Sequence, residues 1–451
     1  MRATLELFRN ERRARVFFAV LAQSALGNGA GYVALLIIAY ERFDSAWAIG
    51  LVLLADLVPA MLLGPLFGAA ADRWSRRKCM VAADVLRAAA FGGIVLVDGF
   101  AATAALAVVA GTGTGLFTPA ALASVPSLVA PSRTAAAMAV YGAIADIGFI
   151  LGPAIAAAAL LAGGPETLLA ANAATFVISG IVLLRLRFGA APTSEAGDRP
   201  SLLRETRQGM GVMLRLSGVR TVVAGSAAML LFAGLFNVAE LPFVRADLGG
   251  DDAGFAILVA IYGLGFVGGS LSGGRGGRPL ELKRRFLLGL ALVSGGFLGA
   301  GLAPGVVVAT LGFALAGTGN GLILVYERLL IQTTVPDRLL GRAFGVKDGL
   351  TAWAFAVAFV AAGGLVEAFG ARAVVIAAGI GGGVVSVGSA LALRGAWADQ
   401  TPVASADDSA PPAEQPVAAS RLLGPAGAGY GSQAQREPHP RYGWPPAHRV
   451  R

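Results

Sequence analysis

Among the acidic residues inside long apolar segments, where few side chains can do chemistry, three are candidates for moving protons. They are Asp56, Asp146 and Glu327. A charge at the centre of a membrane helix costs about 2.5 to 3.5 kcal/mol on insertion scales, so an acid found there is a functional candidate. A neutral acid is far cheaper to bury than its anion, and such a carboxyl can therefore carry a proton through a conformational change. We predict that these three residues are the candidates for proton coupling.

Each of the three acids also has a structural interpretation. Asp56 could be a hydrogen-bonded packing residue, and Asp146 could belong to a static salt bridge. Glu327 is followed directly by Arg328, so a plain ion pair between these neighbours is an alternative. These alternatives stay open at the level of the sequence.

Three further charged residues lie in apolar segments. Asp84 and Arg87 are three residues apart and can neutralise each other on one helix face, which favours a structural role. Glu240 precedes Leu241 and Pro242 near the end of another apolar segment. The sequence assigns Glu240 no role.

The residue types that most enzymes need are almost absent. The only cysteine is Cys79, and the only histidines, His439 and His448, lie near the C-terminus. A Ser-His-Asp triad, a disulfide framework or a thiolate metal cluster therefore cannot form in the apolar body. None of the lysines follows Gly, which excludes a phosphate-binding Gly-Lys-Ser/Thr loop. We expect no enzymatic activity, no cofactor and no metal.

The composition indicates a chain surrounded by lipid. Of 451 residues, 56% are hydrophobic and 14% are charged, and the mean hydropathy is +0.70. Soluble domains carry about 25% charged residues. Apolar runs of about 20 residues can cross the hydrocarbon core, and the sequence has twelve such runs. They are residues 15–40, 47–71, 79–98, 101–128, 136–162, 166–188, 219–244, 254–275, 286–304, 306–330, 344–369 and 372–394. An all-α integral membrane protein with twelve transmembrane helices is predicted.

Basic residues between the predicted spans are distributed very unevenly. Most lie on one side, whereas the opposite connections carry only Arg42, Arg245 and Arg372. The positive-inside rule then predicts that both termini are cytoplasmic. The preference for Arg over Lys is typical of GC-rich bacterial genomes, so a bacterial plasma membrane is the expected location. The net charge of +9 is a topology signal, and we expect lipid rather than nucleic acid as a partner.

An internal repeat divides the chain. Gly111-Thr-Gly-Thr-Gly-Leu116 in the fourth predicted span returns as Gly317-Thr-Gly-Asn-Gly-Leu322 in the tenth, and each is followed by a Pro-x-Arg. Two repeated halves with a pathway between them are the architecture of a secondary transporter. The predicted domains are a six-helix half (1–188), a cytoplasmic linker (189–218), a second six-helix half (219–395) and a disordered cytoplasmic tail (396–451).

The connection after the second predicted span carries a recognisable motif. It reads Gly68-Ala-Ala-Ala-Asp72-Arg73-Trp74-Ser75-Arg76-Arg77-Lys78. This resembles the G-x-x-x-D-R-x-x-R-R/K loop of the major facilitator superfamily, which occupies the same position in that family. The resemblance implies that Asp72 pairs with the N-terminal end of the eleventh helix, near Phe344, and helps to lock an outward-open state. The implied conformational latch comprises Gly68, Asp72, Arg73, Arg76 and Arg77. Membrane anchoring with a helix stop is the simpler alternative.

Further motifs resemble one subgroup of that family. Gly148, Gly152 and Pro153 match a G-x-x-x-G-P element of its proton-coupled exporters, although ordinary helix packing would also explain the two glycines. Residues 172–179 and 332–345 look like the twelve-span drug:proton antiporters, which include macrolide-efflux-type and enterobactin-export-type proteins. The first span has Gly-Asn where those relatives often have Gly-Asp, and the fourth span lacks their Arg.

The glycines at 263, 265 and 268 match a dinucleotide-binding pattern only by spacing. Gly263-Leu-Gly265-Phe-Val-Gly268 lies inside an apolar run with no strand before it, so helix packing is the better explanation.

The predicted function is proton-coupled export of a hydrophobic or amphiphilic small molecule, such as a drug, macrolide or siderophore, by alternating access. A monomer is expected, with the substrate, protons and lipid as partners. Import of a small polar nutrient is one alternative. A membrane sensor or scaffold that transports nothing is another, and an integral-membrane enzyme is the weakest.

Overall fold

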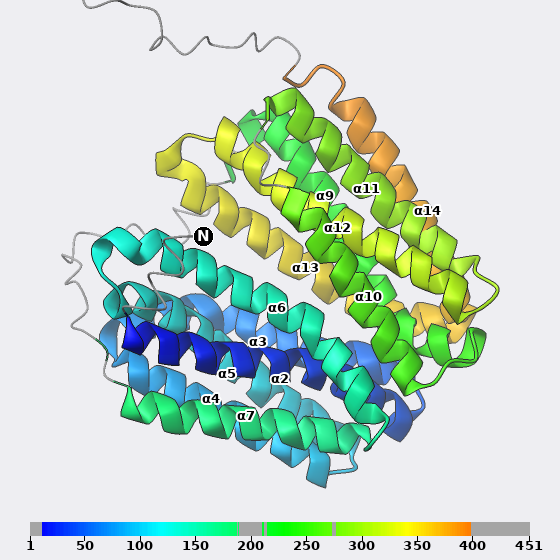
Figure 1. Cartoon of the computed structure of the whole chain (residues 1–451). Coiled ribbons are helices and arrows are strands. Elements are labelled where there is room, and N and C mark those ends of the chain that lie inside the picture. Colours follow the sequence, from blue (N-terminus) through cyan, green and yellow to red (C-terminus); the bar gives the residue numbers. More distant parts are fainter. Residues whose placement is uncertain (1–10, 187, 189–209, 212–213, 273–276, 398–451) are drawn as a thin grey trace, which may run out of the picture. The chain divides into compact units, whose positions relative to one another are not determined.

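The computed structural model describes residues 11–186, 188, 210–211, 214–272 and 277–397. The predicted linker falls mostly outside these residues, as does nearly all of the predicted tail. Within them the chain is helical and contains no strand. The N-half consists of α2 (Arg12–Phe43), α3 (Ala46–Arg73), α4 (Arg76–Leu96), α5 (Phe100–Ser124), α6 (Thr134–Leu160) and α7 (Pro165–Arg185), with short turns η1 (Val125–Leu128) and η2 (Pro131–Arg133). The C-half consists of α9 (Ser217–Pro242), η3 (Phe243–Asp247), α10 (Asp252–Leu271), α11 (Pro279–Gly301), α12 (Val306–Thr334), α13 (Asp337–Phe369) and α14 (Ala371–Ala392) (Figure 1).

The long helices of the two halves coincide one to one with the predicted spans. Within the described residues, ten of these helices are long and apolar enough to cross a membrane. Charged residues in the first turns of α11, among them Lys283 and Arg284, lower the hydropathy of that helix. In α6 the described apolar stretch, Ile150–Leu160, is shorter than a full span. The prediction of an all-α membrane protein is confirmed.

The two glycine repeats make the same kind of contact in each half. A Cβ atom on Gly111 of α5 would overlap the carbonyl oxygen of Asp56 on α3. A Cβ on Gly317 of α12 would overlap the carbonyl oxygen of Tyr262 on α10 in the same way. Because small residues let membrane helices approach closely, the repeat sets two equivalent helix crossings.

Other helix contacts follow the same correspondence. In the N-half α2 packs on α6 and α7, and α4 packs on α5 and α7. In the C-half α9 packs on α13 and α14, and α11 packs on α12 and α14. The halves are pseudo-symmetric in these contacts, while the predicted domain boundaries remain a prediction.

The halves meet through α3 against α13 and α6 against α10. A Cβ on Gly363 would lie 2.8 Å from the Cα of Trp47, and a Cβ on Gly263 would lie 3.0 Å from the Cα of Ile150. Gly263 belongs to the pattern that mimics a dinucleotide site, and its contact with α6 is the packing role expected from the sequence.

We call the end of the bundle at which α2 begins and α3 ends the basic end, and the other end the opposite end. At the basic end, Nη1 of Arg133 lies 3.1 Å from a carboxylate oxygen of Glu11. In the C-half, Nζ of Lys283 donates to the carbonyl oxygen of Leu393, 3.0 Å away, just beyond the C-terminus of α14. A cation is favourable beside the free carbonyls at a helix C-terminus.

Candidate functional site

Two polar contacts join the halves at the opposite end. Nη2 of Arg245, in η3, lies 2.6 Å from a carboxylate oxygen of Glu41 at the end of α2. Nε of the same guanidinium donates to Asp252 at 2.8 Å, so Arg245 bridges the N-half and the start of α10. The hydroxyl of Ser45 also donates to Glu367 of α13. These contacts close the opposite end in this structure.

Arg245→Ala is expected to loosen this closure. Exposed ion pairs contribute about 0.2 to 1 kcal/mol each, so losing the bridge between the halves shifts an open-closed equilibrium by about 1.4- to fivefold. Val238 faces Gly50 across the two halves and is fully buried, so a Val238→Cys variant can report the opening. The native Cys79 is buried and gives a low background. Labelling by a water-soluble maleimide should be about 1.4- to fivefold faster when Arg245→Ala is added.

The matched control for this experiment is Arg220→Ala. Arg220 is an exposed arginine at the basic end, where it donates to the carbonyl oxygen of Leu214. The Arg220→Ala substitution removes the same positive charge, but far from the contacts that join the halves at the opposite end. Equal labelling rates in the two variants would contradict a role for Arg245 in closing the opposite end.

Asp84 and Arg87 form the buried pair expected from the sequence. Arg87 donates to Asp84, and both side chains are at most 4% exposed. The guanidinium carbon lies 4.2 Å from the ring centroid of Phe117 and 4.3 Å from that of Phe176. Asp56 on α3 is half-buried and interacts electrostatically with Arg87. The proton candidate Asp56 therefore shares the N-half with a cation that Asp84 already pairs.

Arg87→Met is expected to destabilise the protein strongly. Removing one member of a buried ion pair leaves the other charge uncompensated, which costs about 3 to 5 kcal/mol. The double variant Asp84→Asn with Arg87→Met removes both charges and should recover most of this loss. Thermal unfolding of the purified proteins measures the stability of the single and the double variant. An Arg87→Met variant as stable as the parent would show that the ion pair contributes nothing to the stability of the protein.

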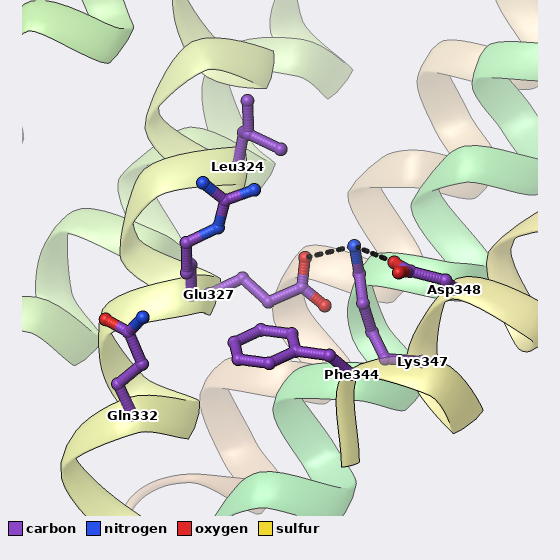
Figure 2. Close-up of a pocket in the computed structure, with 7 residues that line it drawn as sticks. Leu324, Glu327, Gln332, Phe344, Lys347 and Asp348 are labelled. Carbon is purple, nitrogen blue, oxygen red and sulfur yellow. Dashed lines mark hydrogen bonds and ion pairs between the residues drawn. The ribbon is translucent and has the colours of Figure 1, made fainter. Parts of the chain in front are cut away.

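Glu327 lies in a cavity of about 300 Å³ between α12 and α13 (Figure 2). Its side chain is 4% exposed. The cavity is lined by Leu324, Glu327, Arg328, Gln332, Phe344, Lys347 and Asp348. Because the cavity holds Gln332 near the end of α12 and Phe344 near the start of α13, it lies toward the basic end.

The cation beside Glu327 comes from another helix. Nζ of Lys347 lies 3.9 Å from one carboxylate oxygen of Glu327 and donates to Asp348 at 3.1 Å (Figure 2). Asp348 is 70% exposed, so Lys347 links a buried acid to one in contact with solvent. The other oxygen, Oε1 of Glu327, is buried and has no hydrogen-bond partner among the described residues. This is a long ion pair with an unsatisfied acceptor, an arrangement that a proton on the carboxyl would change.

The sequence pointed to Arg328 as a possible partner of Glu327, whereas the ion pair in the structure is with Lys347. From the sequence, Lys347 and Asp348 are interpreted as interfacial rather than coupling residues, because they lie near the start of a predicted span, where charges usually mark the interface. The structure shows that α13 begins at Asp337, seven residues before the predicted span. Lys347 therefore lies about three helical turns into the helix, deeper than an interfacial anchor needs.

The glycines of the G-x-x-x-G-P element pack α6 against α2. A Cβ on Gly148 would lie 2.6 Å from the carbonyl carbon of Ala25, and one on Gly152 would lie 2.7 Å from the backbone nitrogen of Ala30. Pro153 follows inside α6. These residues bring two backbones of the N-half into direct contact, which agrees with the packing interpretation.

Several predicted site residues have side chains outside the described residues. They include Asp146 and, in the predicted latch, Asp72 and Arg73. The described latch residues are Arg76 and Arg77. Nη1 of Arg76 donates to the carbonyl oxygen of Ala123 at 2.6 Å, and Arg77 donates to the carbonyl oxygen at position 184. Both arginines therefore hold the start of α4 to neighbouring helices of the N-half.

One buried acid was left without a role by the sequence. Glu240 near the end of α9 is 5% exposed. Tyr32 of α2 and Tyr262 of α10 interact electrostatically with it. Nδ2 of Asn320 donates to the hydroxyl of Tyr262 at 2.9 Å. The sequence signal was the acid itself, inside an apolar run without a neighbouring basic residue.

Among the described residues, no group of three or more His, Cys, Asp or Glu side chains gathers in a way that could hold a metal ion.

A bundle of two repeated six-helix halves, with carboxyls buried between helices, is the architecture of a secondary transporter. The sequence profile of the Major Facilitator Superfamily matches residues 16–346, and the chain belongs to this family. It is therefore a multi-pass transporter of the bacterial membrane, and this family is not a family of enzymes.

Curated relatives cover most of the chain. The uncharacterized MFS-type transporter YfiS of Bacillus subtilis is 25% identical over 372 residues, which are 81% of this chain and 89% of YfiS. The multidrug efflux pump Tap of Mycolicibacterium fortuitum is 29% identical over 383 residues, covering 80% of this chain and 91% of Tap. Macrolide efflux protein A of Streptococcus pyogenes is 23% identical over 340 residues, covering 71% and 81%.

Solved structures share the fold. A crystal structure of the nucleoside transporter NupG aligns with a TM-score of 0.67 at 13% identity, covering 85% of this chain and 99% of that one. A bacterial homologue of the human lysosomal transporter Spinster, in an inward-facing and unoccupied conformation, aligns with a TM-score of 0.66 at 15% identity, covering 85% and 98%. At these identities the likeness concerns the fold alone.

Proposed function

We propose that this chain is a proton-coupled exporter of a hydrophobic or amphiphilic small molecule and works by alternating access. The observation that carries the proposal is the buried Glu327, which has one oxygen 3.9 Å from Lys347 and the other without a partner. A carboxyl in this setting changes its interactions when it gains or loses a proton, because only the anion attracts the lysine.

The proposed cycle uses this change. In the state closed at the opposite end, Glu327 is an anion paired with Lys347, and the substrate enters from the basic end. The halves then rock, the opposite end opens, the substrate leaves and Glu327 takes up a proton. The neutral acid is cheaper to carry back through the apolar interior, and the proton is released at the basic end. By the positive-inside rule the basic end is cytoplasmic, which makes this cycle export.

We assign roles in this cycle to the other predicted site residues. Asp146 and Asp56 are further proton candidates, and the positive charge of Arg87 acts on Asp56. Asp72 would act at the start of α13 when the basic end closes. The named functions of Tap and macrolide efflux protein A, efflux pumps of similar length, support export over import.

The experiment is transport by the purified full chain in proteoliposomes with an imposed pH gradient. Lipophilic cations, macrolides and siderophores form the substrate panel. Flux of at least one compound against its concentration gradient, abolished when the pH gradient collapses, is the expected result. Flux that does not depend on the pH gradient would contradict proton coupling. Gradient-driven movement of a polar nutrient instead would favour import, and no flux of any compound would favour a sensor or scaffold.

A further inference from the structure

We propose that a groove between the start of α9 and α13 binds one anionic phospholipid, with the phosphate on Arg220 and an acyl chain between the two helices. The proposal concerns a lipid held by the protein and not the transported compound, so it does not rest on the proposed function. It can be tested by binding alone, without any gradient.

The groove is a cavity of about 480 Å³. All its lining residues belong to α9, to α13 or to the chain just before α9. Along α13 it extends from Gly345 to Trp353, which is about 12 Å at about 1.5 Å per residue. Every lining residue except Arg220 is apolar. A long apolar groove with a single cation complements a lipid that has an apolar chain and an anionic headgroup.

Two glycines keep the groove open. A Cβ atom on Gly345 or on Gly349 would meet nothing within 4 Å. On the same helix, a Cβ on Gly363 would lie 2.8 Å from the Cα of Trp47, where close packing requires the glycine. In the described part of the chain, no side chain fills the space beside Gly345 and Gly349. An unfilled void loses the dispersion contacts of its lining, and a lipid chain restores them.

The groove opens toward the lipid. Leu350, Trp353 and Val357 are exposed apolar residues of α13, and their spacing of three and four places them on one helix face. In a membrane-spanning helix an exposed apolar face meets lipid chains, which are as apolar as leucine. The groove shares no lining residue with the cavity that holds Glu327. It is therefore separate from the proposed proton site.

Arg220 places a positive charge at the end of the groove where the headgroup would lie. It is the fourth residue of α9, at the basic end, and its side chain is exposed. Nη1 donates to the carbonyl oxygen of Leu214 at 3.3 Å, which engages one N–H group of the guanidinium. The others can donate to a phosphate, which arginine binds strongly and often through two hydrogen bonds. The positive-inside rule assigns the basic end to the cytoplasmic leaflet, which carries anionic lipids.

The charge favours a lipid over other occupants of the groove. No acidic residue lines it, so a second copy of the chain docking by twofold symmetry would bring the Arg220 side chains of both copies together. A neutral apolar compound would leave the guanidinium without an anion, and inorganic phosphate would leave the apolar groove empty. An anionic lipid satisfies both parts of the groove.

The test uses the tryptophan at the inner end of the groove. Phosphatidylglycerol and phosphatidylcholine with identical brominated acyl chains are each titrated against the purified full chain in detergent, and bromine quenches the fluorescence of a tryptophan that it contacts. Because one basic residue strengthens the binding of anionic lipid about fivefold, phosphatidylglycerol should quench at a concentration about fivefold lower. Trp353→Phe should remove this difference. Equal quenching by the two lipids, or a difference that persists in Trp353→Phe, would overturn the proposal.

Filling the groove should prevent binding. Gly349→Leu adds a side chain in open space, so it should block the acyl chain without disturbing the fold. The difference between the two lipids should then disappear. Gly383→Leu makes the same change on α14, where a Cβ also meets nothing within 4 Å, but outside the groove, and should bind as the parent does. An unchanged preference in Gly349→Leu would contradict the groove as the binding site.

A second pair of variants assigns the preference to one charge. Arg220→Ala should lower the preference for phosphatidylglycerol to about twofold or less. Arg394→Ala removes an exposed arginine just after α14, also at the basic end but outside the groove, and should keep the preference of the parent. Retained preference in an Arg220→Ala variant that elutes as a single species would refute the assignment of the phosphate to Arg220. Without added anionic lipid the site is empty in parent and variant alike, so Arg220→Ala still serves as the control for labelling of the Val238→Cys protein.

Discussion

Glu327→Gln is expected to abolish transport driven by a pH gradient while leaving substrate exchange intact. Glutamine has nearly the shape of glutamic acid but never ionises, so the variant is fixed close to the protonated form. The attraction between Lys347 and the carboxylate, which lie 3.9 Å apart, is lost in both states of the cycle. Uptake driven by the gradient should fall to the level of empty liposomes. Counterflow, which needs only the movement of the loaded protein, should keep most of the parent rate.

The neighbouring acid provides the control for this prediction. Asp348 lines the same cavity and accepts from the same Lys347, but it is 70% exposed (Figure 2). Asp348→Asn removes a charge that water already screens, so gradient-driven transport should change by about twofold at most. If Glu327→Gln retained coupled transport, Glu327 would be excluded as the essential proton carrier, and Asp146 and Asp56 would remain.

Gly152→Leu is expected to prevent the protein from folding. A Cβ at this position would lie 2.7 Å from the backbone nitrogen of Ala30, and backbone atoms cannot move aside as a flexible side chain can. The clash would push α6 away from α2 and lose the close helix packing on which membrane proteins depend. Overpacking typically costs about 1 to 3 kcal/mol, and a clash with backbone belongs at or beyond the upper end. The yield of protein eluting as a single species should fall at least tenfold.

Gly142 on the same helix is the matched position. A Cβ there would meet nothing within 4 Å, so Gly142→Leu adds the same side chain to α6 in open space. Its yield and thermal unfolding should remain close to those of the parent. A normal yield for Gly152→Leu would show that α2 and α6 can separate without loss of the fold.

The sequence was sufficient to predict the class of fold. The long apolar runs and the basic connections between them indicate that lipid surrounds the chain. The repeated glycines indicate close local packing. All three features depend on residue type and spacing, which the sequence contains. The glycines at 111 and 317 could be paired by sequence alone because both mark a point where two backbones must touch.

The candidate site was predictable only in part. Glu327 could be named because a buried acid is costly wherever it lies. Its partner Lys347 could not, since the two residues come from different helices and their meeting depends on how α12 and α13 sit in the bundle. The sequence assigned Glu240 no role for the same reason. Its neighbours Tyr32 and Tyr262 belong to α2 and α10, which are distant in the chain.

An all-α, membrane-embedded fold with an internal repeat could thus be predicted from the amino-acid sequence alone, because hydropathy and small-residue spacing act locally. Which charges meet is decided only by the tertiary structure. Arg87 pairs with Asp84, as the local spacing suggested, whereas Glu327 pairs across helices with Lys347. Glu240 is buried, and the ion pairs of the described residues do not include it. The physical reason is that the energy of a buried charge depends on the three-dimensional positions of its neighbours, and these follow from the packing of all the helices together.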